Sequence, residues 1–127
     1  MNTTTTVPLH LSDAARAQLI VIDVQERLCA AMPAKVLSRV VQNARLLVTA
    51  AARLGVPLLV SEQYPTGLGG TLAELRDLLP AGFSPVAKTR FSLAGLEAVE
   101  ASLASEDQRT ELVLLGMEAH VCVLQTA

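Results

Sequence analysis

Aromatic side chains and charge are both scarce in this sequence of 127 residues. It contains no Trp, one Tyr and two Phe, so it offers no set of aromatic rings on which single-stranded nucleic acid stacks. The formal net charge is -2, and the Lys and Arg residues are scattered along the chain rather than gathered into a basic stripe. We therefore expect neither a nucleic-acid partner nor a membrane partner.

Cysteine is also rare, and long apolar runs are missing. Cys29 and Cys122 are far apart, and neither has a second Cys or a His at metal-ligand spacing, so no disulfide framework is indicated. No apolar run approaches the roughly 20 residues that a membrane-spanning helix needs. The first residues carry a Thr run but lack the basic start and long apolar stretch of a secretory signal. The expected location is the cytoplasm.

Short apolar runs do alternate with longer helix-periodic stretches. Hydrophobic residues make up 51% of the chain, enough to fill the core of one domain. The alternation is typical of parallel strands joined by crossover helices. It predicts an α/β fold, a three-layer α/β/α Rossmann-like sandwich with a mostly parallel sheet. The expected strands cover residues 19–22, 56–60, 85–87 and 112–115, and the expected helices cover residues 36–54, 72–79 and 93–103.

Local signals mark the ends of these helices. Gly55 supplies a left-handed stop after the first helix. Thr71 and Glu74 form a capping-box pattern ahead of the second helix, and Ser92 is suited to cap the third. Residues 61–70, which are rich in Gly and Pro, are expected to form a loop.

Three reactive side chains follow the expected strands. Asp23 comes directly after the first strand, Lys88 after the third and Cys122 shortly after the fourth. In an open parallel sheet, ligands bind beyond the carboxyl ends of the strands, so these side chains can share one crevice. A carboxylate, an ammonium and a thiol supply a base, a cation that stabilises a thiolate and a soft nucleophile. Covalent acyl transfer needs these three types of group.

The segments around these residues resemble a known superfamily. Val21 to Gln25, Lys88 to Ser92 and Gly116 to Val123 are similar, in order and separation, to the motifs of the isochorismatase-like cysteine hydrolases. This superfamily includes nicotinamidases and N-carbamoylsarcosine amidohydrolases. The loop from Glu62 to Gly69 looks most like the isochorismatase domain-containing group.

The resemblance implies a role for each residue. Asp23 takes the proton of the thiol, Lys88 lowers the pKa of the thiol and orients the pair, and Cys122 attacks a carbonyl carbon. The backbone N–H groups of Cys122 and Glu118 form the oxyanion hole. Collapse of the tetrahedral intermediate expels an amine or ammonia and leaves a thioester, which water activated by Asp23 then hydrolyses.

The implied partner is a small-molecule substrate, an amide or related acyl compound. Members that act on the vinyl ether of isochorismate generally lack the cysteine, so Cys122 favours amide hydrolysis. The expected pocket residues are Leu28, Tyr64, Phe91 and His120. Nicotinamidases carry a metal-binding Asp and His pair after the second strand, where this sequence has no His. We therefore expect no metal and no other cofactor.

The sequence ends soon after the expected nucleophile. The resemblance implies an N-terminal segment, residues 1–16, and a hydrolase domain, residues 17–127, whose C-terminal part is missing because relatives usually continue well beyond the cysteine. An uncovered sheet edge favours association between chains. We therefore expect a homo-oligomer.

Other functions stay open at this point. A catalytically inactive module that binds ligands or forms oligomers keeps the same fold, and a vinyl-ether hydrolase of the isochorismatase type is a further alternative. A redox thiol needs a resolving cysteine, for which Cys29 is the single candidate. Cys29 is otherwise expected to be a packing residue.

Overall fold

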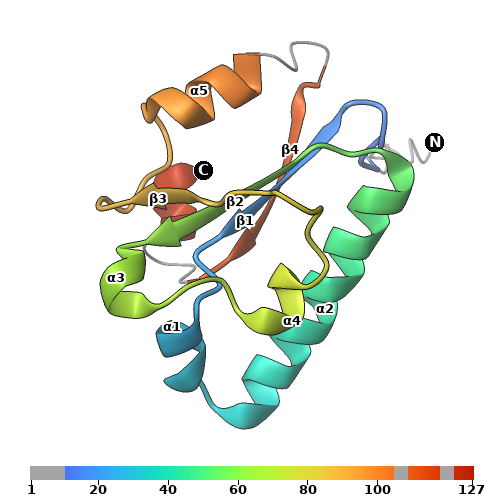
Figure 1. Cartoon of the computed structure of the whole chain (residues 1–127). Coiled ribbons are helices and arrows are strands. Elements are labelled where there is room, and N and C mark those ends of the chain that lie inside the picture. The colour runs from blue at the N-terminus through green and yellow to red at the C-terminus, as the bar shows by residue number, and fades with distance from the viewer. Residues whose placement is uncertain (1–10, 105–108, 118–121) are drawn as a thin grey trace, which may run out of the picture.

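A parallel four-stranded sheet forms the centre of the molecule (Figure 1). The computed structural model describes residues 11–104, 109–117 and 122–127. The strand order in the sheet is β3-β2-β1-β4, and every neighbouring pair is parallel. The carboxyl ends of the strands therefore lie at one edge of the sheet. The strands are β1 (Ala17–Ile22), β2 (Leu58–Gln63), β3 (Val86–Lys88) and β4 (Glu111–Gly116).

Helices follow each strand. α2 is the longest, with 21 residues, and Gly55 ends it in the left-handed conformation (φ 68°), which confirms the predicted stop. The helices are α1 (Glu26–Ala30), α2 (Ala34–Leu54), α3 (Pro65–Leu68), α4 (Ala73–Arg76), α5 (Glu97–Ala104) and α6 (Leu124–Thr126). Among the described residues, none of these helices is long and apolar enough to cross a membrane.

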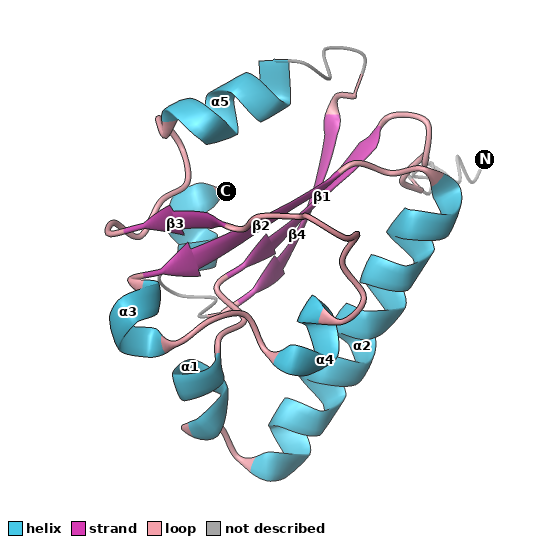
Figure 2. Ribbon diagram, viewed as in Figure 1, coloured by secondary structure: helices cyan, strands magenta, loops and turns pink. Residues whose placement is uncertain are grey.

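The sheet separates two hydrophobic clusters. Alternate side chains of a strand point to opposite faces, so Leu19 and Val21 join one cluster while Ile20 and Ile22 join the other. The first cluster includes buried residues of α1, α2 and α4, and the second includes Val99 of α5. Figures 1 and 2 show α2 and α5 on opposite sides of the sheet. The predicted three-layer α/β/α sandwich with a parallel sheet is confirmed.

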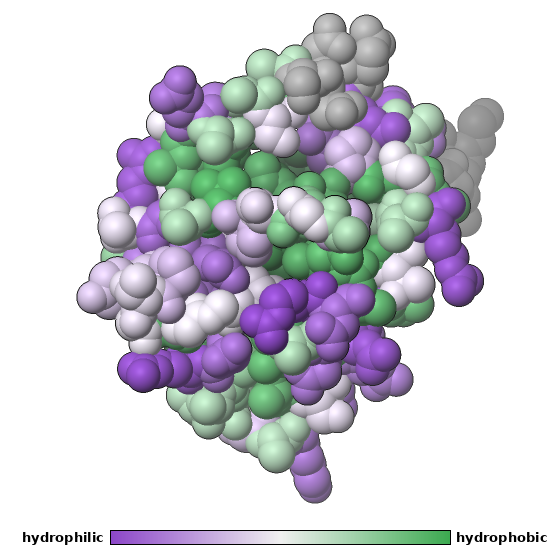
Figure 3. Space-filling model, viewed as in Figure 1, coloured by the Kyte–Doolittle hydropathy of each residue, from purple (hydrophilic) through white to green (hydrophobic). Residues whose placement is uncertain are grey.

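Part of the predicted apolar face of α2 is exposed and not packed into the core. Its buried residues are Ala44, Val48 and Ala51. Val36 and Leu54, which belong to the predicted apolar face, are 48% and 63% exposed. The space-filling view shows further hydrophobic residues over the sheet between α5 and α2, with hydrophilic residues around them (Figure 3).

Several predicted boundaries are wrong. β2 begins two residues later than expected, at Leu58, and runs on through Gln63 into the stretch predicted as a loop. Residues 65–68 of that stretch form α3. A Pro in the first turn of a helix has no N–H that needs a partner, and Pro65 occupies this position in α3.

The two predicted side-chain caps are also wrong. Thr71 does not bond with Glu74; its N–H and its hydroxyl both donate to the carboxylate of Glu62. Ser92 lies five residues ahead of α5, and its hydroxyl accepts from the N–H of Ala94. Thr71 is thus bonded to a residue of β2 and Ser92 to a residue of its own loop, and neither side chain caps a helix.

Candidate active site

Asp23 occupies the first residue after β1. Its side chain is fully buried, and its backbone lies in the left-handed region (φ 54°), which residues other than glycine rarely adopt. The N–H of Asp23 donates to the carbonyl oxygen of Ser61 (3.2 Å), and the Ser61 hydroxyl donates to Oδ1 of Asp23 (2.8 Å). The end of β2 therefore fixes both the backbone and the carboxylate of Asp23.

Lys88 is the last residue of β3, and its side chain is completely buried. Its ammonium nitrogen lies 2.7 Å from Oδ2 of Asp23. It also donates to Oε1 of Gln63 (2.9 Å) and to the carbonyl oxygens of Arg90 (3.0 Å) and Phe91 (2.9 Å). A buried ion pair is tolerated when further hydrogen bonds satisfy both ions, and this pair meets that condition.

Cys122 follows β4, and only 6% of its surface is exposed. Its thiol interacts with both members of the ion pair. Burial raises the pKa of the thiol most, the hydrogen bond and charge of Asp23 raise it further, and the charge and hydrogen bond of Lys88 lower it. Because the net direction is upward, the thiol is protonated at neutral pH. The effect of Lys88 has the expected sign, but the other two effects outweigh it.

The turn that carries Cys122 is held by Thr126. The hydroxyl of Thr126 donates to the carbonyl oxygen of Cys122 (2.7 Å) and accepts from the N–H of Leu93 (3.2 Å). At the carboxyl ends of the strands, Asp23 and Lys88 are thus in contact, and the thiol of Cys122 interacts with both.

Gln25, Gln63 and Ser61 complete this arrangement, and none of the three was predicted as a site residue. The buried side chain of Gln25 accepts from the N–H of Gln63 (2.7 Å) and donates to the carbonyl oxygens of Gln63 (2.9 Å) and Gly69 (2.8 Å). The strand register contained the signal for Ser61, because Ser61 pairs with Ile22, the residue before Asp23. Both glutamines lie in motifs quoted above, the stretches from Val21 to Gln25 and from Glu62 to Gly69, but the sequence carried no signal for the contacts that their side chains make.

The expected pocket residues lie in different surroundings. Tyr64 and Phe91 are each 56% exposed, and both adjoin Lys88: the N–H of Tyr64 donates to the carbonyl oxygen of Lys88, and the carbonyl oxygen of Phe91 accepts from its ammonium. Leu28 packs against the hydrophobic cluster on the α2 side of the sheet, whereas Cys122 belongs to the cluster on the other side. Tyr64 and Phe91 thus lie near the ion pair, and Leu28 packs elsewhere.

Two predicted residues, Glu118 and His120, lie outside the described residues. Within the described ranges, no group of three or more His, Cys, Asp or Glu side chains is placed to hold a metal ion.

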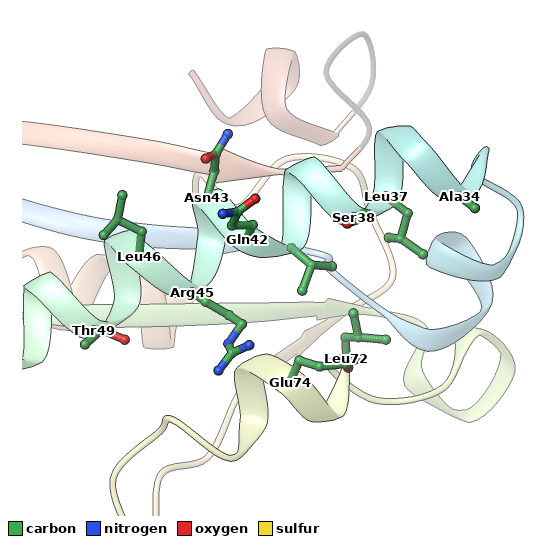
Figure 4. Close-up of a pocket in the computed structure, with 11 residues that line it drawn as sticks. Ala34, Leu37, Ser38, Gln42, Asn43, Arg45, Leu46, Thr49, Leu72 and Glu74 are labelled. Atoms are coloured by element: carbon green, nitrogen blue, oxygen red, sulfur yellow. The ribbon is translucent and has the colours of Figure 1, made fainter.

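A surface groove lies away from these residues. It has a volume of about 890 Å³ and is formed by α2 and α4 (Figure 4). Leu37 and Leu72 contribute apolar surface, while Arg45 and Glu74 contribute charge. None of the three reactive side chains lines it.

Cys29 does not serve as a resolving cysteine in this arrangement. Its buried thiol donates to the sulfur of Met117 (3.7 Å), and both residues belong to the cluster on the α2 side of the sheet. Cys122 belongs to the opposite cluster, and both cysteines are free. The structure therefore supports the packing role for Cys29 and not the redox alternative.

Comparison with known proteins identifies relatives. Isochorismatase domain-containing protein 1 of Salmo salar is 43% identical over 105 residues, which are 83% of this chain and 35% of that protein. A structure described as the MAR1 ribonuclease from Caenorhabditis elegans is 35% identical, has a TM-score of 0.80 and aligns with 91% of this chain and 57% of its own. The chain thus spans about a third of the curated relative.

A more distant structure shares the fold alone. It is the YcaC gene product from Escherichia coli, described as an octameric hydrolase of unknown specificity. It is 19% identical with a TM-score of 0.70, over 87% of this chain and 54% of its own. Residues 17–127 of the present chain match the family model of the isochorismatase domain. The chain therefore belongs to the isochorismatase family.

Proposed function

We propose that the protein is a cysteine-dependent hydrolase that acts on a small amide or related acyl compound through a thioester. The observation that carries the proposal is the buried Asp23–Lys88 pair, at 2.7 Å, with the thiol of Cys122 in interaction with both side chains. A carboxylate beside a thiol that is protonated at rest is the arrangement that general-base activation of a nucleophile requires.

The first half of the reaction forms the thioester. Asp23 accepts the thiol proton while the sulfur of Cys122 attacks the carbonyl carbon, and the charge that develops on the carbonyl oxygen is held by the backbone N–H groups of Cys122 and Glu118. Lys88 keeps the carboxylate oriented and offsets the negative charge. The C–N bond then breaks, and the departing amine takes the proton from Asp23.

The second half returns the thiol. Asp23 accepts a proton from water, the hydroxide oxygen attacks the thioester carbon, and the C–S bond breaks. The proton held by Asp23 passes to the sulfur of Cys122, and the carboxylic acid leaves. Tyr64 and Phe91, which are both exposed and adjoin Lys88, would contact an apolar side of the substrate in this proposal. No residue of the proposed cycle requires a metal or other cofactor.

A panel of small amides tests this function, with ammonia or amine release as the measurement. Cys122→Ser is expected to lower kcat/KM by about 10²-fold or more, because a serine hydroxyl is a far weaker nucleophile beside the same base. Cys29→Ser is the matched control, and it is expected to keep turnover. Equal turnover by the wild-type protein and Cys122→Ser would contradict the proposal.

The same panel separates the alternatives. A folded chain that binds amides but releases no amine would be the inactive binding module, and hydrolysis of isochorismate that survives Cys122→Ser would be vinyl-ether chemistry. The ribonuclease named for the C. elegans structure is not favoured here, because the site cation, Lys88, is buried and already meets four oxygens.

We further propose that the protein is a homo-oligomer in the cytoplasm. The exposed apolar residues of α2 and the octamer described for the E. coli structure support association between chains. Light scattering after size exclusion gives the mass directly. A monomer at micromolar concentration would contradict the oligomer, and recovery in a secreted or membrane fraction would contradict the location.

A further inference from the structure

The ammonium group of Lys88 has more acceptors than protons to offer them. A lysine ammonium carries three N–H donors. Four oxygen atoms lie within hydrogen-bond distance of its nitrogen, from Asp23 (2.7 Å), Gln63 (2.9 Å), Phe91 (2.9 Å) and Arg90 (3.0 Å). Any further acceptor must therefore compete with these oxygens for an N–H.

Gln63 supplies the one neutral side chain among the four acceptors. Its orientation is fixed by chemistry, because an ammonium can only donate and the amide oxygen must therefore face Lys88. Its backbone is held on both sides by Gln25, at 2.7 Å through the N–H and 2.9 Å through the carbonyl. The amide oxygen is thus presented to Lys88 by a rigid support.

A thiolate at Cys122 would be the competing acceptor. The thiol interacts with Lys88 by charge and by hydrogen bonding, and both effects favour its ionised form. An N–H that Gln63 occupies is not available to stabilise the thiolate. We propose that Gln63 is a positioning residue that sets how readily Cys122 ionises, by occupying one donor of Lys88. The inference rests on the proposed nucleophilic role of Cys122.

Other charges near the thiol do not account for the same effect. Among the described residues, Asp23 and Lys88 are the charged groups that act on the Cys122 thiol. α6 carries no charged side chain, and the two acids of α5, Glu97 and Glu100, are exposed. The ionisation of Cys122 therefore depends on which acceptors the three N–H groups of Lys88 bind.

Two substitutions of Gln63 are expected to move the ionisation of Cys122 in opposite directions. Gln63→Leu roughly keeps the size of the side chain but removes the acceptor, so that a thiolate competes with three oxygens instead of four for the three N–H groups of Lys88. Gln63→Glu places a second carboxylate beside the Asp23–Lys88 pair, which gives the group a net negative charge and disfavours a thiolate at Cys122. We expect the pH midpoint of Cys122 alkylation to fall by about half a unit in the first variant and to rise by about one unit in the second.

The measurement is the rate of iodoacetamide modification of Cys122 against pH, with all variants made in a Cys29→Ala background so that a single thiol reacts. Gln42→Leu, an exposed glutamine of α2, is the matched control and is expected to leave the midpoint unchanged. Gln63→Met gives a second apolar variant if Gln63→Leu fails to fold. A merely structural role for Gln63 would move the apolar and acidic variants in the same direction.

Opposite shifts of the two midpoints support the inference, and shifts of one sign, or none, overturn it. Because alkylation needs no turnover, this result is independent of the amide panel. Opposite shifts in a chain that hydrolyses no amide would keep the inference and remove the proposed function. Amide hydrolysis with unshifted alkylation midpoints would keep the proposed function and overturn the inference about Gln63.

Discussion

Removal of Lys88 should cost a large part of the folding free energy. In Lys88→Met the aliphatic stem is largely kept, but the fully buried Asp23 carboxylate loses its ion partner at 2.7 Å. Breaking a buried pair by deletion of one partner costs about 3–5 kcal/mol, against a total stability of about 5–15 kcal/mol for a typical domain. Three further acceptors lose their donor, so we expect the upper half of this range.

Urea denaturation followed by circular dichroism measures the loss directly. The double variant Asp23→Asn with Lys88→Met removes both charges, and it should recover about 2 kcal/mol relative to the sum of the single variants, since neighbouring residues couple by 0.5–3 kcal/mol in such cycles. Arg53→Met, on the exposed side of α2, is the control for loss of a surface cation. A loss below about 1 kcal/mol in Lys88→Met, the value of a surface ion pair, would refute the claim that the pair is buried.

Two further outcomes follow from single residues. Gly116→Ala should destabilise the fold by about 3 kcal/mol or more in thermal melts, because φ is 152° and an added Cβ would overlap the carbonyl oxygen of Ile22. Gly82→Ala is the control: an added Cβ there meets open space, and the substitution should cost about 1 kcal/mol in the same melts. Burial raises the pKa of Cys29, with the charge of Glu74 as a smaller cause. The contribution of the protonated Cys29 thiol to the folding free energy is therefore complete below the unfolded pKa of about 8.5, and it is lost as pH rises through the folded pKa. Cys29→Ala should therefore flatten the fall in stability above pH 8.5, and an unchanged slope would contradict the assignment.

Sequence patterns predicted the elements that the core dictates. The helix expected at residues 36–54 is α2 (Ala34–Leu54), and the apolar run at 112–115 lies inside β4. The parallel arrangement was sufficient to expect Asp23 near Lys88, whose side chains are in contact, because the carboxyl ends of parallel strands meet at one edge of the sheet.

The predictions that were wrong concern contacts between residues that are distant in sequence. The pairing of Thr71 with Glu62 replaced the local capping box, and the contacts of Gln25 join a helix start to a strand end and a loop. Propensity and periodicity describe neighbours in the chain, so they carry no information on such pairs. The rise in the pKa of Cys122 was not predicted for the same reason, because burial, its largest cause, is a property of the fold.

The strand order β3-β2-β1-β4 also has a consequence for synthesis. β1 is the first of the four described strands in chain order and lies in the interior of the sheet, and its partner on one side, β4, is the last of the four. Until β4 emerges, β1 presents an open row of backbone N–H and C=O groups and the apolar side chains beside them. The nascent chain therefore passes through a long interval in which chaperone binding competes with self-association.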